Sequence, residues 1–288
     1  MFEIENLIIV KTEELSVAEL DILSCQVRLD VLEVAGTSGG GHLGGTFSSV
    51  DILVNLFSSN LFDFKTKNKL GKDVDKFILS KGHACLAYYS ILYRQNLITN
   101  DLMNTFAKND GLGAQLDISV PFVDWNTGSL GHSIGICAGM AHASKLNRSK
   151  SKAVTLIGDS ELAEGASWEA IAYAGDNQLS NLIVIIDRNR LSVTTRIEND
   201  SIYSGLDLKL ESFGWKFIEI NGHRHEELSK GLNLAVHSSK PVLMLANTLK
   251  GKGVSFMENN PIWHHTRPTE EQLDAAKNEL KALQEELN

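Results

Sequence analysis

Apolar segments of five or six residues alternate with helical patterns in the second half of this chain, and this alternation limits its fold most. Four such segments are predicted as strands, at residues 153–157, 182–186, 216–220 and 241–246. Continuous apolar runs are typical of strands buried on both faces, and strands separated by helices pair in parallel. The pattern predicts an α/β fold, a parallel sheet with helices on both faces. Ligands of such sheets bind beyond the carboxyl ends of the strands.

The first half of the chain shows mainly helical periodicity. Apolar side chains recur at helical spacing over residues 17–35, and the following run of three glycines ends the pattern. A second helix is predicted over residues 48–57, opened by serines suited to capping, and residues 76–80 are a strand candidate. An amphipathic helix begins near Thr269. Because no internal repeat or linker is evident, the prediction is a single domain over residues 1–288.

Composition and charge argue against several classes of protein. Of the 288 residues, 43% are apolar, and the formal net charge of −9 provides no general basic face for nucleic acid or for an anionic membrane. No apolar run approaches the roughly 18 residues of a membrane span, and the acidic N-terminus does not resemble a signal peptide. Three widely separated cysteines fit a reducing compartment. We therefore expect a soluble cytoplasmic protein with no nucleic-acid partner and no membrane partner.

Oxygen-bearing side chains follow two neighbouring predicted strands. Asp159 comes directly after the first strand, between Gly158 and Ser160, and Asn189 follows the next strand. Because adjacent parallel strands end side by side, the Asp159 carboxylate, the Asn189 amide and the Leu191 carbonyl can converge on one Mg²⁺ ion, whose octahedron phosphate oxygens and water complete. The small residues beside Asp159 would let backbone N–H groups approach a diphosphate. The alternative is that Asp159 and Asn189 only cap a helix and shape a turn.

Segments spread over nearly the whole chain resemble transketolases. The pair GDSELAEG (158–165) and IIDRNRLSV (185–193) is similar to the thiamine-diphosphate motif, in which a Gly-Asp-Gly opening is followed by an asparagine. Four further segments match in order: SGGGHLGG (38–45), SKGHA (80–84), TGSLGHS (127–133) and KGKGVSFMENNPIWHH (250–265). The resemblance implies the thiamine-diphosphate-binding fold. It also implies transfer of a two-carbon ketol unit from a ketose or its phosphate to an aldose or its phosphate.

The resemblance also implies a role for each matching residue. The Mg²⁺ or Ca²⁺ ligands would be Asp159, Asn189 and the carbonyl of Leu191. The residues that bind thiamine diphosphate would be His83, Gly128, Ser129, Leu130, Gly158, Ser160, Asn189 and His264. The substrate would face His42, Gln115 and His264. The catalytic set would be His42, His83, His264 and Glu164, the last at a subunit interface where it couples two active sites.

Histidine suits this chemistry, because protons must reach and leave substrate oxygens and the imidazole pKa is about 6.5. Imidazole N–H groups can also donate to a diphosphate. The alternative without a functional role is that His42 is an exposed residue of a glycine-rich loop and that His83 is only packed at the start of a helix. His264 aligns better than the adjacent His265. The remaining histidines match no motif and are interpreted as surface or packing residues: His142, His223, His225 and His237.

Several positions depart from the family pattern. Ser160 replaces the second glycine of the motif, and Gln115 stands where the family has a histidine that touches the first hydroxyl of the substrate. Glutamine can hydrogen-bond a hydroxyl but cannot transfer a proton. At the position of His132, transketolases usually have glutamine, and the His132-Ser133 pair is more similar to the segment of 1-deoxyxylulose-phosphate synthase. Lys250 and Lys252 could attract a phosphate, but a solvated loop is the favoured interpretation.

In transketolases, the glutamate that activates the cofactor comes from a second, pyrimidine-binding domain, and no segment here resembles that domain. We therefore expect the partner to be a C-terminal transketolase subunit, the assembly to be a 2 + 2 heterotetramer, and this chain alone to show no turnover. Three alternatives stay open at this point. They are an acyloin synthase, a 2-oxoacid dehydrogenase component, and a non-catalytic scaffold.

Overall fold

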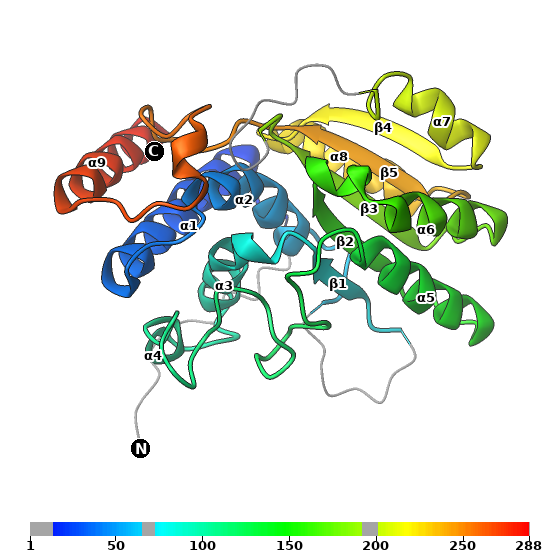
Figure 1. Cartoon of the computed structure of the whole chain (residues 1–288), viewed down its shortest axis with the longest axis horizontal. Helices are drawn as coiled ribbons and strands as arrows, with labels where there is room; N and C mark the ends of the chain where they lie inside the picture. The colour runs from blue at the N-terminus through cyan, green and yellow to red at the C-terminus, as the bar shows by residue number, and fades with distance from the viewer. Residues whose placement is uncertain (1–13, 65–72, 192–200, 288) are drawn as a thin grey trace.

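A single five-stranded sheet forms the centre of the computed structural model, which describes residues 14–64, 73–191 and 201–287 (Figure 1). The strand order is β1-β2-β3-β5-β4, and every neighbouring pair is parallel. The strands are β1 (Lys76–Leu79), β2 (Ala153–Gly158), β3 (Leu182–Arg188), β4 (Lys216–Asn221) and β5 (Val242–Asn247). The predicted parallel sheet is confirmed, and each strand lies within two residues of its predicted bounds.

Two of the segments interpreted from the sequence lie outside the described residues. The acidic N-terminus falls in residues 1–13, and the last two positions of IIDRNRLSV fall in residues 192–200. Within the described ranges, no helix is both long enough and apolar enough to cross a membrane.

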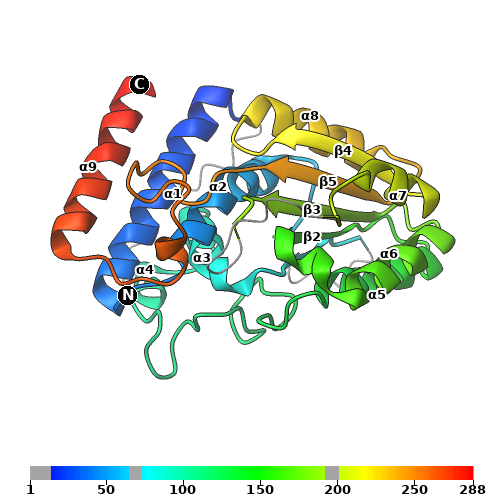
Figure 2. The same ribbon diagram turned by 45° about the horizontal axis from the view of Figure 1, so that its top comes forward.

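Helices cover both faces of the sheet, as the sequence predicted. One core cluster joins strand residues such as Ile183 and Ile185 to four helices: α1 (Val17–Ser38), α2 (Leu43–Ser58), α3 (Cys85–Arg94) and α8 (His225–Val236). A second cluster joins Val184 and its neighbours to three others: α5 (Ser133–Leu146), α6 (Gly165–Asp176) and α7 (Leu206–Ser212). Successive residues of a strand point to opposite faces. The apolar residues of the strands therefore fill both cores, and Figure 2 shows the resulting layers.

The remaining elements lie at the ends and edges of these layers. They are α4 (Asn100–Met103), α9 (Glu270–Leu287) and three 3-10 turns, η1 (Gly82–Ala84), η2 (Asp159–Ala163) and η3 (Pro261–His264). Helix α9 is the predicted amphipathic tail, and it packs along α1 with Ala276 and Leu280 buried (Figure 1). Helix α1 begins with a capping box at Ser16 and ends at Gly39, whose φ of 91° is left-handed.

The start of α2 corrects one prediction. The helix begins at Leu43 rather than at residue 48, and the serines predicted as caps are buried inside it. The hydroxyls of Ser48 and Ser49 donate instead to Asp187 at the end of β3. Glycine at position 44 makes the earlier start possible, because a Cβ there would lie 2.9 Å from the carbonyl oxygen of Trp263. The result is that the N-terminus of α2 lies close to η3.

Candidate active site

Three predicted histidines from distant parts of the chain meet beyond the carboxyl ends of the strands. His42 immediately precedes α2, His83 lies in η1 after β1, and His264 ends η3. The ring centroid of His42 is 5.2 Å from that of His83 and 5.3 Å from that of His264, and the His83–His264 separation is 5.7 Å. His265 touches the same group from the outside, with its centroid 4.6 Å from that of His42.

Burial keeps these three imidazoles uncharged. Together with neighbouring cationic groups, burial lowers the pKa of His42 to about 4, of His83 to about 2 and of His264 to about 4. Each ring is therefore neutral at pH 7. A neutral imidazole carries one N–H donor and one acceptor nitrogen. The cluster can thus donate hydrogen bonds to an anion or a hydroxyl and can also accept a proton.

Lys250 lies beside this cluster, which corrects the prediction that it belongs to a solvated loop. Its side chain is buried, and its Nζ is 3.1 Å from Nδ1 of His264. Burial and the nearby Lys81 lower the pKa of Lys250 to about 8, so the group is mostly an ammonium at pH 7. Because an ammonium only donates, Nδ1 of His264 accepts and its Nε2 carries the proton. Lys252, by contrast, is partly exposed, with Nζ 3.6 Å from Glu258.

The structure also brings two of the predicted metal ligands, Asp159 and Asn189, to the same backbone turn. Asp159 opens η2 directly after β2, and Asn189 follows β3 by one residue. The carboxylate of Asp159 accepts the backbone N–H of Arg190 at 2.7 Å and that of Ser160 at 2.9 Å, and the side-chain oxygen of Asn189 accepts the N–H of Leu191 at 3.1 Å. Arg190 has a left-handed φ of 62°, which turns the chain back toward Asp159. These contacts hold the ends of β2 and β3 together.

The electrostatics of this corner favour a nearby positive charge. Burial and the neighbouring carboxylate of Asp187 raise the pKa of Asp159 to about 6, so a cation near Asp159 would relieve an unfavourable charge. In the ranges that the structure covers, no three His, Cys, Asp or Glu side chains gather closely enough to hold a metal. The predicted metal ligands are of another kind, because they include a single carboxylate, that of Asp159, with the amide of Asn189 and the carbonyl of Leu191.

A buried ion pair that the sequence analysis missed connects the strand ends. Lys81 after β1 pairs with Asp187 at the end of β3, and both side chains are buried. Asp187 also accepts from Ser48 at 2.6 Å, from Ser49 at 3.0 Å and from the hydroxyl of Thr248. Although burial acts to raise it, the Lys81 ammonium lowers the pKa of Asp187 below its ordinary value. The available signal was a charged residue immediately after each of two predicted strands, Lys81 after residues 76–80 and Asp187 after residues 182–186.

Glu161 is a second residue that the sequence analysis missed. Its buried carboxylate accepts the N–H of Gly158 at 2.8 Å, the N–H of Gly131 at 2.9 Å and the hydroxyl of Ser80. These bonds attach the TGSLGHS segment (127–133) to the end of β2. The predicted cofactor contacts Gly128, Ser129 and Leu130 are exposed in that segment, immediately before Gly131.

The predicted substrate and interface residues lie around the same edge. The side-chain oxygen of Gln115 is buried without a hydrogen-bond partner in the described structure, and a Cβ on Gly82 would come within 2.4 Å of it. A free acceptor next to His83 suits a substrate hydroxyl. Glu164 is exposed at the start of α6, and His132 is exposed at the start of α5.

Neutral imidazole donors, a buried ammonium and a carboxylate with a raised pKa, all at the carboxyl ends of parallel strands, fit a diphosphate bridged to a cation. A comparison with protein families agrees with this geometry, since residues 22–285 match the family described as transketolase, thiamine diphosphate binding domain. The chain belongs to the transketolase family. Thiamine diphosphate as the cofactor and the thiamine-diphosphate-binding fold are thereby confirmed.

Two of its relatives are transketolase subunits of about the same length. One is a subunit of the apulose-4-phosphate transketolase of Phocaeicola vulgatus, which is 33% identical over 275 residues, covering 95% of this chain and 98% of the relative. The other is the 6-deoxy-6-sulfo-D-fructose transketolase subunit SqwG of a Clostridium species, which is 33% identical over 258 residues, covering 88% of this chain and 94% of the relative.

Other relatives are about twice as long or longer. Human transketolase is 31% identical over 241 residues, which cover 83% of this chain but only 38% of the human protein. The crystal structure of Campylobacter jejuni transketolase superposes with a TM-score of 0.85 at 26% identity, covering 95% of this chain and 46% of that one. The matches support a thiamine-diphosphate-dependent transferase of the transketolase type rather than the acyloin-synthase or dehydrogenase alternatives.

Proposed function

We propose that this chain is the diphosphate-binding subunit of a cytoplasmic two-chain transketolase. With a C-terminal partner subunit that carries the pyrimidine-binding domain, it transfers a two-carbon ketol unit from a ketose phosphate to an aldose phosphate. The named subunits from Phocaeicola and Clostridium, which this chain matches over nearly their whole length, support this division. The observation that carries the proposal is the cluster of neutral histidines and buried Lys250 beside Asp159 and Asn189.

In this proposal, the chain binds the diphosphate half of the cofactor. His83 and His264 donate N–H groups to phosphate oxygens, and the segment of Gly128, Ser129 and Leu130 lies along the cofactor. Gly158 and Ser160 supply the close backbone approach at the end of β2. When bound, thiamine diphosphate supplies the nucleophilic carbon and the electron sink that cleavage of a carbon–carbon bond beside a carbonyl requires.

The histidines of this chain hold and move protons at substrate oxygens. Because the pKa of His42 is lowered to about 4, its ring is unprotonated before substrate binds and can accept a hydroxyl proton. His264, whose Nδ1 accepts from Lys250, donates from Nε2. Gln115 accepts a hydrogen bond from a substrate hydroxyl and so orients it, without exchanging the proton. Exclusion of water by the buried cluster strengthens each of these interactions.

The proposed metal is Mg²⁺, or Ca²⁺ in its place. Asp159, Asn189 and the Leu191 carbonyl give three oxygen ligands, and phosphate oxygens and water complete the six that Mg²⁺ prefers. The raised pKa of Asp159 and the hydrogen bonds that join Asp159 and Asn189 to one backbone turn support this assignment.

The proposed assembly is a 2 + 2 heterotetramer with Glu164 at an interface between subunits. The test is ketol transfer from xylulose 5-phosphate to ribose 5-phosphate, measured for the chain alone and for the chain with its partner subunit. We expect turnover that needs both chains, thiamine diphosphate and Mg²⁺, and none with pyruvate as donor. Robust transfer by the chain alone, or activity confined to pyruvate, would overturn the proposal.

A further inference from the structure

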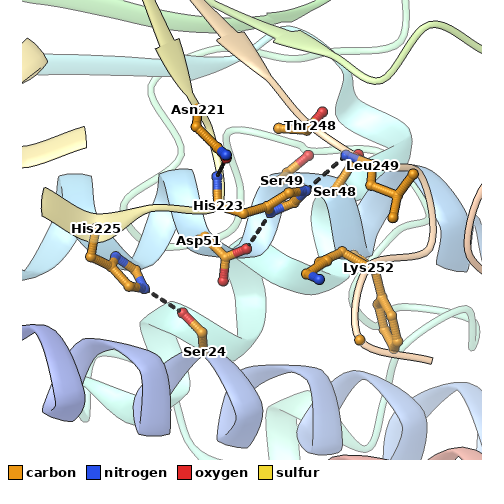
Figure 3. A network of polar contacts seen from close by, with 12 residues as sticks. Ser24, Ser48, Ser49, Asp51, Asn221, His223, His225, Thr248, Leu249 and Lys252 are labelled. Carbon is orange, nitrogen blue, oxygen red and sulfur yellow. Dashed lines mark hydrogen bonds and ion pairs between the residues drawn. The ribbon is translucent and has the colours of Figure 1, made fainter. Parts of the chain in front are cut away.

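A buried chain of hydrogen bonds links α1 and α2 to the loop after β5, and Figure 3 shows its central part. Arg28 donates from both terminal nitrogens to the carboxylate of Asp51, at 2.9 and 2.7 Å. His223, between β4 and α8, donates from Nδ1 to Oδ2 of Asp51 at 2.6 Å. On the other side of the ring, Nε2 of His223 accepts the backbone N–H of Leu249 at 2.7 Å.

The Asp51 carboxylate determines which nitrogen of His223 carries the proton. Burial acts to raise the pKa of Asp51, but Arg28 and His223 together hold it well below its ordinary value. Asp51 is therefore ionised and can only accept, so Nδ1 of His223 must carry a hydrogen. In the neutral ring, Nε2 then has a free lone pair directed at the N–H of Leu249. The backbone N–H of His223 is also held, by the side-chain oxygen of Asn221 at 2.9 Å.

Leu249 directly precedes Lys250, whose ammonium contacts His264 in the active site. The loop is attached on both sides of this point, because Thr248 N–H donates to the carbonyl of Arg188 at 3.0 Å and Gly251 N–H donates to the carbonyl of Gly44 at 2.9 Å. Between these anchors, the N–H of Leu249 is held by the ring of His223. The orientation of the peptide between Thr248 and Leu249, one residue before Lys250, thus depends on that ring.

We infer that His223 is a positioning residue of the active site, which fixes the peptide between Thr248 and Leu249, one residue before Lys250, relative to Asp51 on α2. It thereby sets where Lys250 and His264 meet the cofactor diphosphate. The inference rests on the proposed function, since it assumes that Lys250 and His264 face a diphosphate. It adds a residue whose sequence pattern indicated only surface or packing.

Two conservative variants separate the two ring nitrogens. In His223→Gln, the amide oxygen reaches about as far as Nε2 and can still accept from Leu249. In His223→Asn, the shorter amide reaches only the Nδ1 position, where it can donate to Asp51 but leaves the N–H of Leu249 without its acceptor. The Kd of thiamine diphosphate is measured at saturating Mg²⁺ on the chain assembled with its partner subunit. Hydrogen exchange of the Leu249 amide is followed on the same samples.

We expect His223→Asn to raise the Kd about tenfold and to speed exchange at Leu249, as loss of one buried hydrogen bond predicts. His223→Gln should stay within about twofold of the unmodified enzyme. At saturating cofactor, the KM for the ketose phosphate should be unchanged in both variants. Should His223→Asn not fold, His223→Ser also leaves the N–H of Leu249 without the ring acceptor and carries the same expectation.

The matched controls are His237→Asn and His237→Gln, on an exposed histidine after α8. A purely stabilising role for His223 predicts lower melting temperatures with an unchanged Kd in the folded variants. That result, or an Asn variant that binds at least as tightly as the Gln variant, overturns the inference. Failure of the unmodified two-chain enzyme to bind thiamine diphosphate would overturn the proposed function and this inference with it. Normal binding by the unmodified enzyme with an unchanged Kd in His223→Asn would overturn the inference alone, so the two failures are distinguishable.

Discussion

His264 and His265 are neighbours in the chain but lie in different surroundings. His264 is partly buried against His83 and has Lys250 at its Nδ1, whereas His265 is exposed and its ring contacts that of His42. We predict that His264→Gln lowers kcat/KM of the two-chain enzyme about 10²–10³-fold, because one amide cannot both accept from Lys250 at the Nδ1 position and donate to the diphosphate at the Nε2 position. His265→Gln should cost less than about tenfold. A larger loss in the His265 variant would contradict this assignment.

Asp51 is buried and ionised between Arg28 and His223, so its charge should contribute to stability in a pH-dependent way. We predict that Asp51→Asn lowers the free energy of unfolding at pH 7 by about 3–5 kcal/mol, because it leaves Arg28 buried without its counter-charge. The folded pKa of Asp51 is lowered, so this contribution is complete above the unfolded value of about 3.9 and declines as the pH falls toward the folded value. Urea unfolding between pH 3 and pH 8 measures the difference.

Two controls accompany the Asp51 variant. Replacing both members of the pair, Arg28→Met with Asp51→Leu, should recover part of the loss, since apolar side chains of similar size can replace a buried ion pair. A deficit of the same size at pH 3 and at pH 7 would show that the charge of Asp51 is not its cause.

At the scale of elements, the first turn of α2 depends on glycine for its close approach to the active site. A Cβ at Gly44 would lie 2.9 Å from the carbonyl of Trp263 and 3.0 Å from the side chain of Lys250. Alanine ordinarily favours a helix over glycine by about 1 kcal/mol. We nevertheless predict that Gly44→Ala destabilises the chain by about 1–3 kcal/mol and weakens cofactor binding, because Lys250 and η3 must shift.

Gly139 in α5 is the matched control for that substitution, since a Cβ there would meet nothing within 4 Å. Gly139→Ala should stabilise the chain alone by about 0.5–1 kcal/mol. Urea unfolding and titration with thiamine diphosphate measure both variants. An equal gain in stability from both substitutions would show that the contact at Gly44 does not matter.

The elements that could be predicted from the sequence are those that local pattern determines. Apolar runs located the strands of the described sheet, and the position of Asp159 and Asn189 at strand ends followed from them. The start of α2 and the burial of Lys250 could not be predicted in this way, because both depend on distant partners. The hydroxyl of Ser48 meets Asp187 at a separation of 139 positions, and Lys81 meets it at 106. From the neighbouring sequence alone, a serine can equally be a helix cap or a buried hydrogen-bond donor, and a lysine can equally lie in a solvated loop or in a buried ion pair.

At the scale of the whole molecule, the residues of the candidate site come from every strand end of the described sheet. Lys81 follows β1, Asp159 follows β2, Asn189 follows β3, and Lys250 follows β5, while His223 follows β4 and acts through Lys250. The buried ion pair and the hydrogen bonds of Asp51 hold these ends in register before any ligand binds. Such preorganisation lowers the cost of ordering the site when the cofactor arrives.

Glu164 is exposed at this edge of the sheet, so a substitution there can test assembly with the partner subunit separately from folding of the chain. It is solvent-exposed at the start of α6, so Glu164→Ala should change the free energy of unfolding of the chain alone by no more than about 0.5 kcal/mol. If Glu164 lies at the proposed interface, the same variant should weaken association with the partner subunit by at least about tenfold, as loss of a buried charged contact does. Sedimentation of mixtures measures the association constant, and Glu211→Ala, on the exposed surface of α7, is the control. Equal association of both variants would place Glu164 away from the interface, because a charge that remains in solvent contributes little to binding.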